Sequence, residues 1–265
     1  MPKEKVRLDK WLVSSGLAST RERARSLILA GRVSVAGRRV DKPGAQIDPA
    51  DPVALAEPDH PYVSRGGVKL EGALRAFGIS VQGRTALDVG ASTGGFTHCL
   101  LLHGARKVYA VDVGYGQFAW KLRTDPRVVL FERTHIRDLD RSRLVEPVDL
   151  AVIDVSFISL KKVLPWVRPL VRPGGGTLCL VKPQFEVGKG RVGKGGVVRD
   201  PALHREVLEG LERFASNQGL ERIGIEPSCL LGPEGNREFF LFLRNGKADV
   251  SSGPSREGGS GDVPV

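Results

Sequence analysis

The chain is poor in cysteine and has no long hydrophobic run. Its 265 residues include three cysteines, Cys99, Cys179 and Cys229, too few and too scattered for a disulfide framework or a zinc cluster. No window approaches the ~20 consecutive apolar residues of a membrane span, and the first residues, MPKEKVRLDKWLV, are charged where a signal peptide is apolar. The low cysteine count and the lack of a long apolar run argue against a secreted protein, a membrane-spanning protein or a fold stabilised by a structural metal. We expect a cytoplasmic monomer with no metal and no membrane contact.

Acidic residues are scarce relative to basic ones. Forty Lys and Arg stand against 30 Asp and Glu, a formal net charge of +10, and residues 1–43 alone hold eleven basic and four acidic side chains. Clustered positive charge attracts polyphosphates such as RNA, because each neutralised phosphate releases counterions. A solvated, arginine-rich surface gives the same count. Charge alone therefore leaves both interpretations open.

The first 60 residues predict a small α+β module. Apolar residues recur at helical spacing over residues 8–15, and a Ser-x-x-Glu capping box at residues 19–22 predicts a second helix that ends at Gly31. Residues 33–40 predict a hairpin that turns at an Ala-Gly pair. The proline-rich residues 48–61 predict a last strand followed by a stiff linker.

The residues of this module resemble a known RNA-binding fold. Arg7–Leu12, Ser19–Arg25 and Gly31–Val35 are similar to the alpha-L RNA-binding domain of ribosomal, pseudouridine-synthase and synthetase proteins. In that family, two helices lay their basic faces on structured RNA. The resemblance implies that five cations contact phosphates: Arg7, Lys10, Arg21, Arg25 and Arg32. Solvated helix charges are the alternative for each of them.

The rest of the chain has the pattern of a doubly wound α/β domain. Short apolar runs alternate with helical or glycine-rich stretches, and the expected strands are residues 85–89, 107–111, 128–131, 150–155, 177–181, 223–227 and 238–243. This order predicts a mostly parallel, seven-stranded, Rossmann-like sheet. We divide the chain into an RNA-binding domain, a linker, an α/β domain and a disordered tail, at residues 1–57, 58–63, 64–246 and 247–265.

A glycine-rich turn, LDVGASTGGF at residues 87–96, follows the first expected strand. Glycines there let the backbone approach a ligand at the carboxyl edge of the sheet, and Asp112, at the end of the second strand, is suited to bind ribose hydroxyls. A dinucleotide is one possible ligand, although the spacing is not G-x-G-x-x-G. The pattern resembles the S-adenosylmethionine pocket of class I methyltransferases, which is the interpretation we favour.

That resemblance implies a set of cofactor-binding residues. The turn passes beside the amino-acid end of the cofactor, Asp112 binds the ribose, and Asp138 approaches the adenine amino group. Phe118 packs against adenine, with a plain core position as its alternative, and a loop position is the alternative for Asp138. The full set is Asp88, Gly90, Ala91, Ser92, Gly94, Gly95, Phe96, Asp112, Phe118 and Asp138.

Four charged residues lie at strand ends, or beside the sheet, where folding does not need them. Asp154 and Lys182 end two neighbouring strands, Glu238 begins the last strand, which we expect to be antiparallel, and Lys69 lies on the helix before the first strand. We expect these side chains to meet beside the methyl donor. Two ordinary salt bridges are the alternative.

This set resembles the catalytic tetrad of the FtsJ-type ribose 2′-O-methyltransferases. Segments 64–70, 90–97, 154–160, 182–186 and 195–200 are similar to the TlyA family, whose haemolysin-named members resemble ribosomal-RNA cytidine 2′-O-methyltransferases. The resemblance covers residues 6 to about 245. It implies S-adenosylmethionine as cofactor, ribosomal RNA or ribosomal subunits as partner, and further RNA contacts from Arg65, Lys189 and Lys194. His98 and His135 depart from the family pattern, and their roles stay open.

A ribose hydroxyl is a poor nucleophile, so this reaction needs a base. A lysine amine can accept the proton only when burial and a neighbouring cation lower its pKa from the usual ~10.4. We predict that Lys182 is the base and that Lys69 supplies the neighbouring charge and stabilises the alkoxide. Asp154 positions Lys182, and Glu238 orients Lys69 or the ribose.

Other functions fit the sequence less well. Gly188 to Lys194 matches G-x-x-x-x-G-K, but Gly195 stands where a P-loop needs Ser or Thr, so we reject nucleotide hydrolysis and expect a basic lid over RNA or a surface loop. A base methyltransferase would carry prolines after Asp154, which are missing. A noncatalytic RNA-binding protein and a membrane-lytic protein remain as alternatives. The intact tetrad argues against the first, and the lack of a long amphipathic segment argues against the second.

Overall fold

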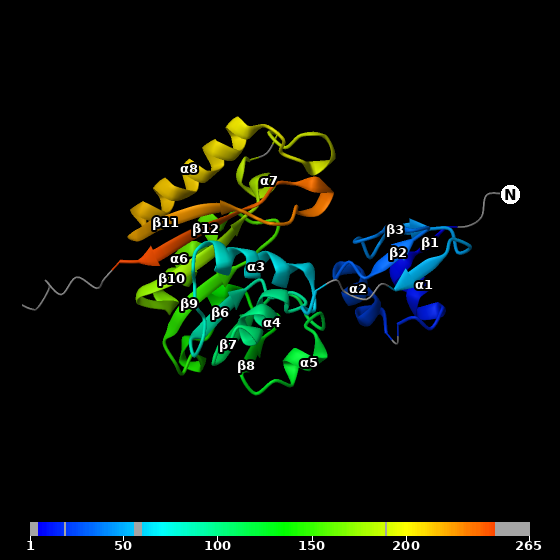
Figure 1. Cartoon of the computed structure of the whole chain (residues 1–265), viewed down its shortest axis with the longest axis horizontal. Coiled ribbons are helices and arrows are strands. Elements are labelled where there is room, and N and C mark those ends of the chain that lie inside the picture. Colours follow the sequence, from blue (N-terminus) through cyan, green and yellow to red (C-terminus); the bar gives the residue numbers. More distant parts are fainter. Residues whose placement is uncertain (1–4, 19, 56–59, 189, 247–265) are drawn as a thin grey trace, which may run out of the picture.

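The computed structural model describes residues 5–18, 20–55, 60–188 and 190–246, which form a small and a large unit (Figure 1). The expected tail at residues 247–265, Lys189 and part of the expected linker lie outside the described residues. No helix among the described residues is long and apolar enough to cross a membrane. The same residues contain no group of three or more His, Cys, Asp or Glu side chains that could hold a metal ion.

The small unit contains two helices and five short strands. Its elements are β1 (Val6–Arg7), α1 (Leu8–Ser14), α2 (Arg21–Leu29), β2 (Val33–Val35), β3 (Arg38–Arg39), β4 (Gln46–Ile47) and β5 (Val53–Leu55). Strand β2 pairs antiparallel with β3 and β5, and β1 pairs with β4. Leu8, Leu12 and Ile28 are fully buried between the helices and these strands.

Local sequence explains the turns of this unit. The expected hairpin is confirmed, and its Ala36 and Gly37 have φ angles of +48° and +75°, as a type I′ turn requires. The helix cap differs from the expected box: Thr20 is the N-cap of α2, and its hydroxyl accepts a hydrogen bond from the Arg23 amide at 3.1 Å. The cap lies one residue later than predicted because Thr20 itself satisfies an unpaired amide of the first turn.

The large unit is built on a seven-stranded sheet in the order β11-β12-β10-β9-β6-β7-β8. The strands are β6 (Thr85–Val89), β7 (Lys107–Val111), β8 (Val128–Phe131), β9 (Val148–Ile153), β10 (Val171–Val181), β11 (Leu220–Pro227) and β12 (Phe239–Asn245). Only β12 among these seven runs antiparallel to its neighbours, so the predicted mostly parallel sheet is confirmed. Strand β10 begins six residues earlier than expected because its glycine-rich start pairs through the backbone without an apolar pattern.

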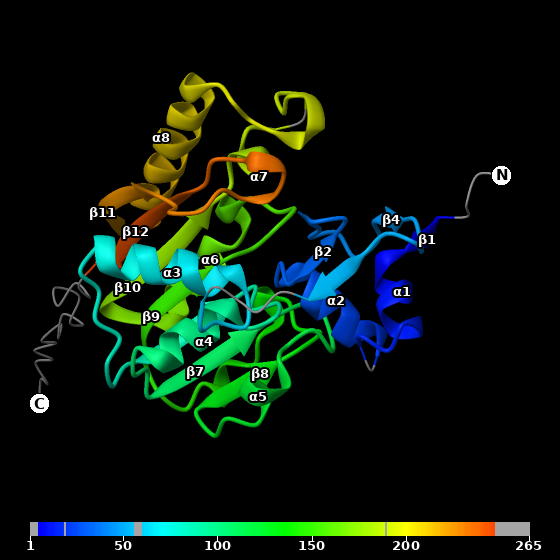
Figure 2. The same cartoon turned by 45° about the vertical axis from the view of Figure 1, so that its right-hand side comes forward.

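Helices cover both faces of this sheet (Figure 2). They are α3 (Arg65–Ala76), α4 (Gly95–Leu102), α5 (Trp120–Arg123), α6 (Leu164–Val167), α7 (Pro183–Glu186) and α8 (Pro201–Asn217). Short 3-10 turns are η1 (Ile136–Asp138), η2 (Arg141–Arg143), η3 (Leu160–Lys162), η4 (Arg168–Leu170), η5 (Lys194–Gly196) and η6 (Pro233–Gly235). One apolar core lies on each face, with α3 and α4 on one and α6 and α8 on the other.

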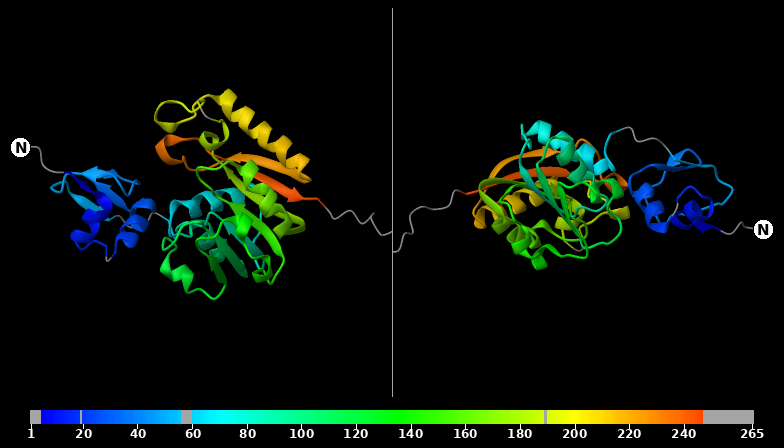
Figure 3. Two further views of the ribbon diagram at one scale, coloured as in Figure 1. Left: turned by 180° about the vertical axis from the view of Figure 1, so that it is seen from behind. Right: turned by 90° about the horizontal axis from the view of Figure 1, so that it is seen from below.

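The topology brings distant residues to one edge of the sheet. The carboxyl ends of parallel strands meet at the same edge, and β12 begins there because it runs the other way. The small unit stands apart from the layers of the large one in every view (Figure 3). It meets the large unit at this edge, where Leu29 and Asp41 line a cavity together with residues of the strand ends.

Candidate active site

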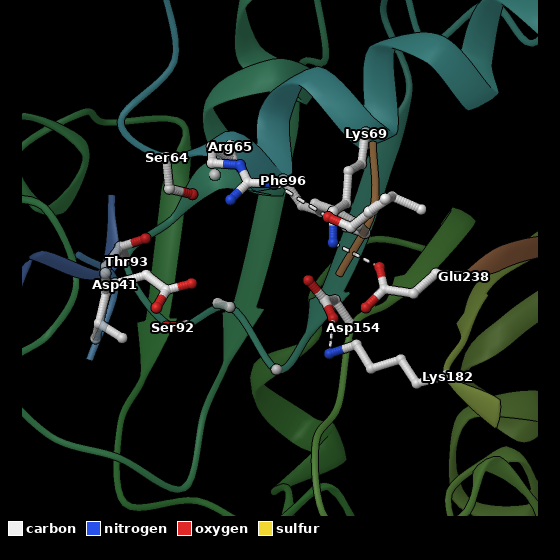
Figure 4. A pocket seen from close by; sticks show the side chains of 16 residues that line it. Asp41, Ser64, Arg65, Lys69, Ser92, Thr93, Phe96, Asp154, Lys182 and Glu238 are labelled. Carbon is white, nitrogen blue, oxygen red and sulfur yellow. Dashed lines mark hydrogen bonds and ion pairs between the residues drawn. The ribbon is translucent and has the colours of Figure 1, made fainter. Parts of the chain in front are cut away.

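A cavity of about 250 Å³ opens at the carboxyl edge of the sheet (Figure 4). Helix α3, the turn after β6, the ends of β9 and β10 and the residue before β12 all contribute to its walls. The charged side chains in it are Asp41, Arg65, Lys69, Asp154, Lys182 and Glu238. All four members of the predicted tetrad therefore lie in one cavity.

The first pair in this cavity joins Lys69 to Glu238. Lys69 Nζ donates a hydrogen bond to Glu238 Oε2 at 2.5 Å, and the two side chains are 10% and 0% exposed. Lys69 comes from the first turns of α3, and Glu238 precedes β12, 169 residues further along the chain. Because both charges are buried, loss of either partner leaves an uncompensated charge, which costs about 3–5 kcal/mol.

The second pair joins Lys182 to Asp154. Lys182 Nζ lies 2.6 Å from Asp154 Oδ1 and donates a further hydrogen bond to Ser156 Oγ at 2.9 Å. The two residues follow β10 and β9, which are adjacent parallel strands. Figure 4 shows both pairs turned toward the same space, with Asp154 drawn between the amino ends of Lys69 and Lys182.

The glycine-rich turn after β6 packs directly against Asp154. Gly90 has φ +86°, and a Cβ atom there would lie 2.3 Å from the Asp154 carbonyl oxygen. Only glycine fits both the conformation and the contact. The turn after β6 is therefore in direct contact with Asp154, the residue that forms the ion pair with Lys182.

A second cavity of about 530 Å³ adjoins the first and shares Gly90, Ser92 and Asp154 with it. The Asp112 carboxylate lies in its wall and accepts hydrogen bonds from the backbone amides of Ser92 at 2.7 Å and Gly114 at 2.6 Å. Apolar side chains form much of the remaining wall: Val89, Val111, Val113, Ile136, Val155, Ile158 and Val163. A carboxylate acceptor, an apolar slot and a close glycine backbone fit a nucleoside cofactor, and the volume is within the usual range for small ligands.

Four predicted cofactor residues, Asp88, Gly94, Phe118 and Asp138, do not line either cavity. Asp88 is fully buried beneath the turn, where its Oδ2 accepts a hydrogen bond from Thr97 Oγ1 at 2.7 Å and burial raises its pKa to about 7. Phe118 is buried in the core, where its ring would lie 3.0 Å from a Cβ atom at Gly94. Its position therefore fits a core residue, which was the alternative to an adenine contact. Gly94 is also outside both linings and begins α4 with φ +91°.

Asp138 does not approach the second cavity. It is exposed at the end of η1 and accepts a hydrogen bond from Arg137 Nε at 2.9 Å. The 3-10 turn after β8 directs His135 and Ile136 to the cavity in its place. His135 also caps η1, because its Nδ1 accepts a hydrogen bond from the Arg137 amide at 3.1 Å.

His98 has a structural role that the sequence left open. Its Nδ1 accepts a hydrogen bond from the Val63 amide at 3.1 Å, and its ring lies edge-on to Tyr62. Burial, together with the charge of Lys121, lowers the pKa of His98 to about 4. The neutral imidazole therefore fixes the segment that leads into α3.

Two of the predicted phosphate contacts hold the small unit together. The buried Asp9 carboxylate accepts hydrogen bonds from Arg7, at 2.9 and 3.0 Å, and from Arg21 at 3.0 Å. The Arg7 guanidinium, more than that of Arg21, holds the pKa of Asp9 low, at about 2. Lys10 and Arg25 are exposed, and Arg32 is half-buried.

The other predicted RNA contacts belong to the large unit. Arg65 lines the catalytic cavity and donates a hydrogen bond to the Leu231 carbonyl at 3.0 Å. Lys194 is exposed on η5. The segment after it is anchored to the loop that carries Glu238, because Asn236 accepts a hydrogen bond from the Val198 amide and donates one to the Gly196 carbonyl.

Phe157 is a functional candidate that the sequence did not reveal. Its ring is 90% exposed, its φ is +65°, and it packs against Phe185 with ring centres 5.0 Å apart. A bulky residue in left-handed backbone is strained, and such strain concentrates at functional sites. Phe157 lines the second cavity, and the two rings lie three residues after Asp154 and Lys182 in the chain.

Comparisons with known proteins match both units. Residues 62–245 match the FtsJ-like methyltransferase family, and residues 6–53 match the S4 domain. The 16S/23S rRNA (cytidine-2'-O)-methyltransferase TlyA of Mycobacterium tuberculosis is 48% identical over 241 residues, 91% of this chain and 90% of that protein. Hemolysin A of Brachyspira hyodysenteriae is 40% identical over 90% of this chain and 99% of its own length. The solved structure of a hemolysin-named protein from Streptococcus thermophilus, 42% identical, covers 94% of this chain and 92% of that one with a TM-score of 0.71.

Proposed function

Because the chain belongs to the FtsJ-like methyltransferase family and carries an S4 domain, we propose that it transfers a methyl group from S-adenosylmethionine to the 2′-hydroxyl of cytidine in ribosomal RNA. The observation that supports this best is the cavity in which Lys69, Asp154, Lys182 and Glu238 meet beside the glycine-rich turn. The substrate is carried over from the TlyA relatives. Because ribosomal RNA is a cytoplasmic substrate, we also propose that the enzyme is cytoplasmic. We further propose that the RNA-binding domain ends at residue 57 and that the methyltransferase domain begins at residue 64.

The second cavity is the proposed cofactor site. Asp112 binds the ribose hydroxyls, the backbone of Gly90 and Ser92 contacts the amino-acid end, and Ile136 and Val155 contact the adenine. When bound, S-adenosylmethionine supplies an electrophilic methyl group on its sulfonium. Since both cavities share the turn and Asp154, a methyl group held in one faces the tetrad in the other.

The tetrad supplies the acid–base chemistry in this proposal. The Lys182 amine accepts the proton of the 2′-hydroxyl as the oxygen forms its bond to the methyl carbon and the bond between that carbon and the sulfonium sulfur breaks, which leaves a neutral thioether. Lys182 Nζ is held 2.6 Å from Asp154 Oδ1 and 2.9 Å from Ser156 Oγ. The Lys69 ammonium stabilises the negative charge that develops on the oxygen. Glu238 fixes Lys69 through the 2.5 Å bond.

The target nucleotide must leave the RNA helix, unpaired and unstacked, to reach this cavity. Enzymes that act on structured nucleic acid extrude the target nucleotide and stack it on aromatic side chains. Phe157, exposed beside Asp154 and supported by Phe185, offers such a surface. Lys10, Arg25, Arg65 and Lys194 are the exposed or cavity-lining cations proposed to contact phosphates around it.

Mapping ribose methylation in ribosomal RNA tests this function. Purified protein with labelled S-adenosylmethionine is incubated with each ribosomal subunit and with the free RNAs, and 2′-O-methyl positions are mapped by resistance to alkaline cleavage. We expect methylation at discrete cytidines of one or both subunits, and none with the Lys182→Ala variant. Methyl transfer to a base, or to no ribosomal RNA at all, contradicts the proposal.

A further inference from the structure

A groove of about 530 Å³ lies between the two units and shares no lining residue with either cavity described above. Helix α2, residues 61–63 and the start of α5 form its walls. Its lining is Arg23, Ser26, Leu27, Ala30, Arg32, Pro61, Tyr62, Val63, Ala119, Trp120 and Lys121. Three of these side chains are cations and none is an acid, so the groove is complementary to an anion.

Trp120 is the most unusual residue of this groove. Its side chain is 74% exposed, although tryptophan offers a large apolar surface that proteins normally bury. It begins the short helix α5 and projects beside Lys121. An exposed indole next to cations is the arrangement with which proteins stack nucleic-acid bases.

Arg23 and Lys121 are two of the cations that line the groove. Neither Arg23 nor Lys121 forms an ion pair with any described carboxylate, whereas Arg7 and Arg21 in the same unit are both bound to Asp9. The surrounding side chains partly desolvate the Lys121 amine and lower its pKa. A desolvated cation without a counter-charge is best satisfied by an incoming anion.

The back of the groove is rigid and close to the catalytic cavity. Tyr62 is buried there, and a Cβ atom at Gly67 would lie 2.2 Å from its ring, so the wall is tightly packed against α3. Helix α2 connects the two sites: Leu27 and Ala30 face the groove, and Leu29 lines the catalytic cavity. The groove and the catalytic cavity are therefore lined by residues less than one helical turn apart.

We propose that this groove binds one nucleotide of ribosomal RNA near the target, with its base stacked on Trp120 and its phosphate held by Arg23 and Lys121. The inference rests on the proposed function and adds a contact made jointly by both units. It assigns to the groove a single-stranded nucleotide, because stacking needs an unpaired base. A ribosomal protein is the other class of occupant, and the experiment below distinguishes it.

Binding measurements on three groove variants test the proposal. The full-length variants Trp120→Ala, Trp120→Phe and Lys121→Gln are compared with wild type and with Arg213→Gln, an exposed cation of α8 outside the groove. Affinity for free ribosomal RNA is measured over a range of salt concentrations, and calorimetry gives the affinity for S-adenosylmethionine. Since stacking is worth ~1–3 kcal/mol per base, we expect Trp120→Ala to weaken RNA binding about 10-fold, and Trp120→Phe to restore most of it.

The charge variant has its own readout. Lys121→Gln should reduce the slope of log affinity against log salt by about one, whereas Trp120→Ala leaves the slope unchanged. Arg213→Gln should alter neither quantity. In a Trp11→Phe, Trp166→Phe background, Trp120 is the sole tryptophan, and added RNA should quench its fluorescence.

Each result decides a separate point. If wild type methylates ribosomal RNA and Trp120→Ala binds that RNA equally well, the groove assignment is wrong while the function stands. If the variants bind free RNA normally but lose affinity for subunits, the occupant is a ribosomal protein and the proposal falls. An equal loss of S-adenosylmethionine affinity would make Trp120 structural and would also overturn it. Failure of wild type to bind or methylate ribosomal RNA contradicts the proposed function, and the groove assignment with it.

Discussion

At the scale of single residues, the active cavity is organised as two lysine–carboxylate pairs from four separate elements. Lys69 is bound to Glu238 and Lys182 to Asp154, and all four side chains are largely buried. Each carboxylate holds one lysine side chain at a defined position, so the carboxylates position the lysines and the Lys182 amine is left to accept the proton. The two pairs are therefore expected to fail in different ways when mutated.

Lys182→Ala is expected to abolish methyl transfer and leave cofactor binding within about twofold of wild type. The amine is the only proposed proton acceptor, whereas the cofactor cavity is lined by other residues. Single-turnover transfer and calorimetric affinity measure the two effects. Lys162→Ala, at an exposed lysine of η3, is the matched control and should retain full activity. Substantial activity in Lys182→Ala would assign the base to another residue.

Asp88 gives a pH dependence of stability with a definite sign. Burial raises its pKa from 3.8 to about 7, so the folded protein keeps a proton that the unfolded chain releases. The stabilising contribution is complete below about pH 4 and is lost as the pH rises toward 7. We expect the cofactor-free protein to lose stability between about pH 4 and pH 7, and Asp88→Asn to lose less.

Urea unfolding at several pH values measures this difference, with the exposed Asp138→Asn as control. An Asp88→Asn variant whose stability falls with pH as steeply as wild type would show that another group causes the dependence.

At the scale of elements, the turn between β6 and α4 connects the cofactor cavity to the tetrad. Its Gly90 touches the Asp154 carbonyl, and Ser92 donates its amide to Asp112. The turn therefore contacts the residues that follow β9 and β7, the two strands on either side of β6. A change in its backbone is expected to affect cofactor affinity and catalysis together.

Gly90→Ala tests the role of the turn. The added Cβ meets a backbone oxygen at 2.3 Å in addition to the strain of φ +86°. Gly188→Ala is a matched control, because its φ is +84° and nothing lies within 4 Å of the added atom. We expect the control to lose about 1 kcal/mol of unfolding free energy and Gly90→Ala to lose more, together with at least tenfold in S-adenosylmethionine affinity. Equal effects of the two variants would mean that the close contact is relieved by a small shift.

At the scale of the whole molecule, the small unit is joined to the catalytic edge by more than the connecting chain. Leu29 and Asp41 line the catalytic cavity, and Lys42 forms an ion pair with Glu234 near the start of β12. The unit therefore lies where RNA bound to its helices is close to the tetrad. The position of the small unit therefore suits a domain that binds RNA and places it near the tetrad.

Deletion of residues 1–60 is expected to weaken ribosomal-RNA binding far more than S-adenosylmethionine binding. The deletion removes the basic helices, and it leaves the hydrogen bond from Val63 to His98 that fixes the start of the large unit. Filter binding and calorimetry measure the two affinities. Equal loss of both would show that the small unit is needed for the fold of the large one.

The sequence by itself determined most elements, because local patterns encode them. Apolar runs placed β6, β7 and β8 at their observed residues, and an Ala-Gly pair located the hairpin turn. Strand ends depended on more than apolarity: β9 ends at Ile153, two residues early, because the chain turns at the loop that holds Phe157. The charged residues of the predicted tetrad could also be singled out, because Asp154 and Lys182 directly follow apolar runs and Glu238 directly precedes one.

Only the tertiary structure decided which residues face one another. Contacts between Lys69 and Glu238, 169 residues apart, depend on how α3 and β12 pack on the sheet. Packing also decided that Asp138 lies outside the second cavity and that Arg7 and Arg21 are bound to Asp9. It likewise formed the groove around Trp120. Local periodicity specifies helices and strands, whereas pairing, burial and exposure follow from packing between segments far apart in the chain.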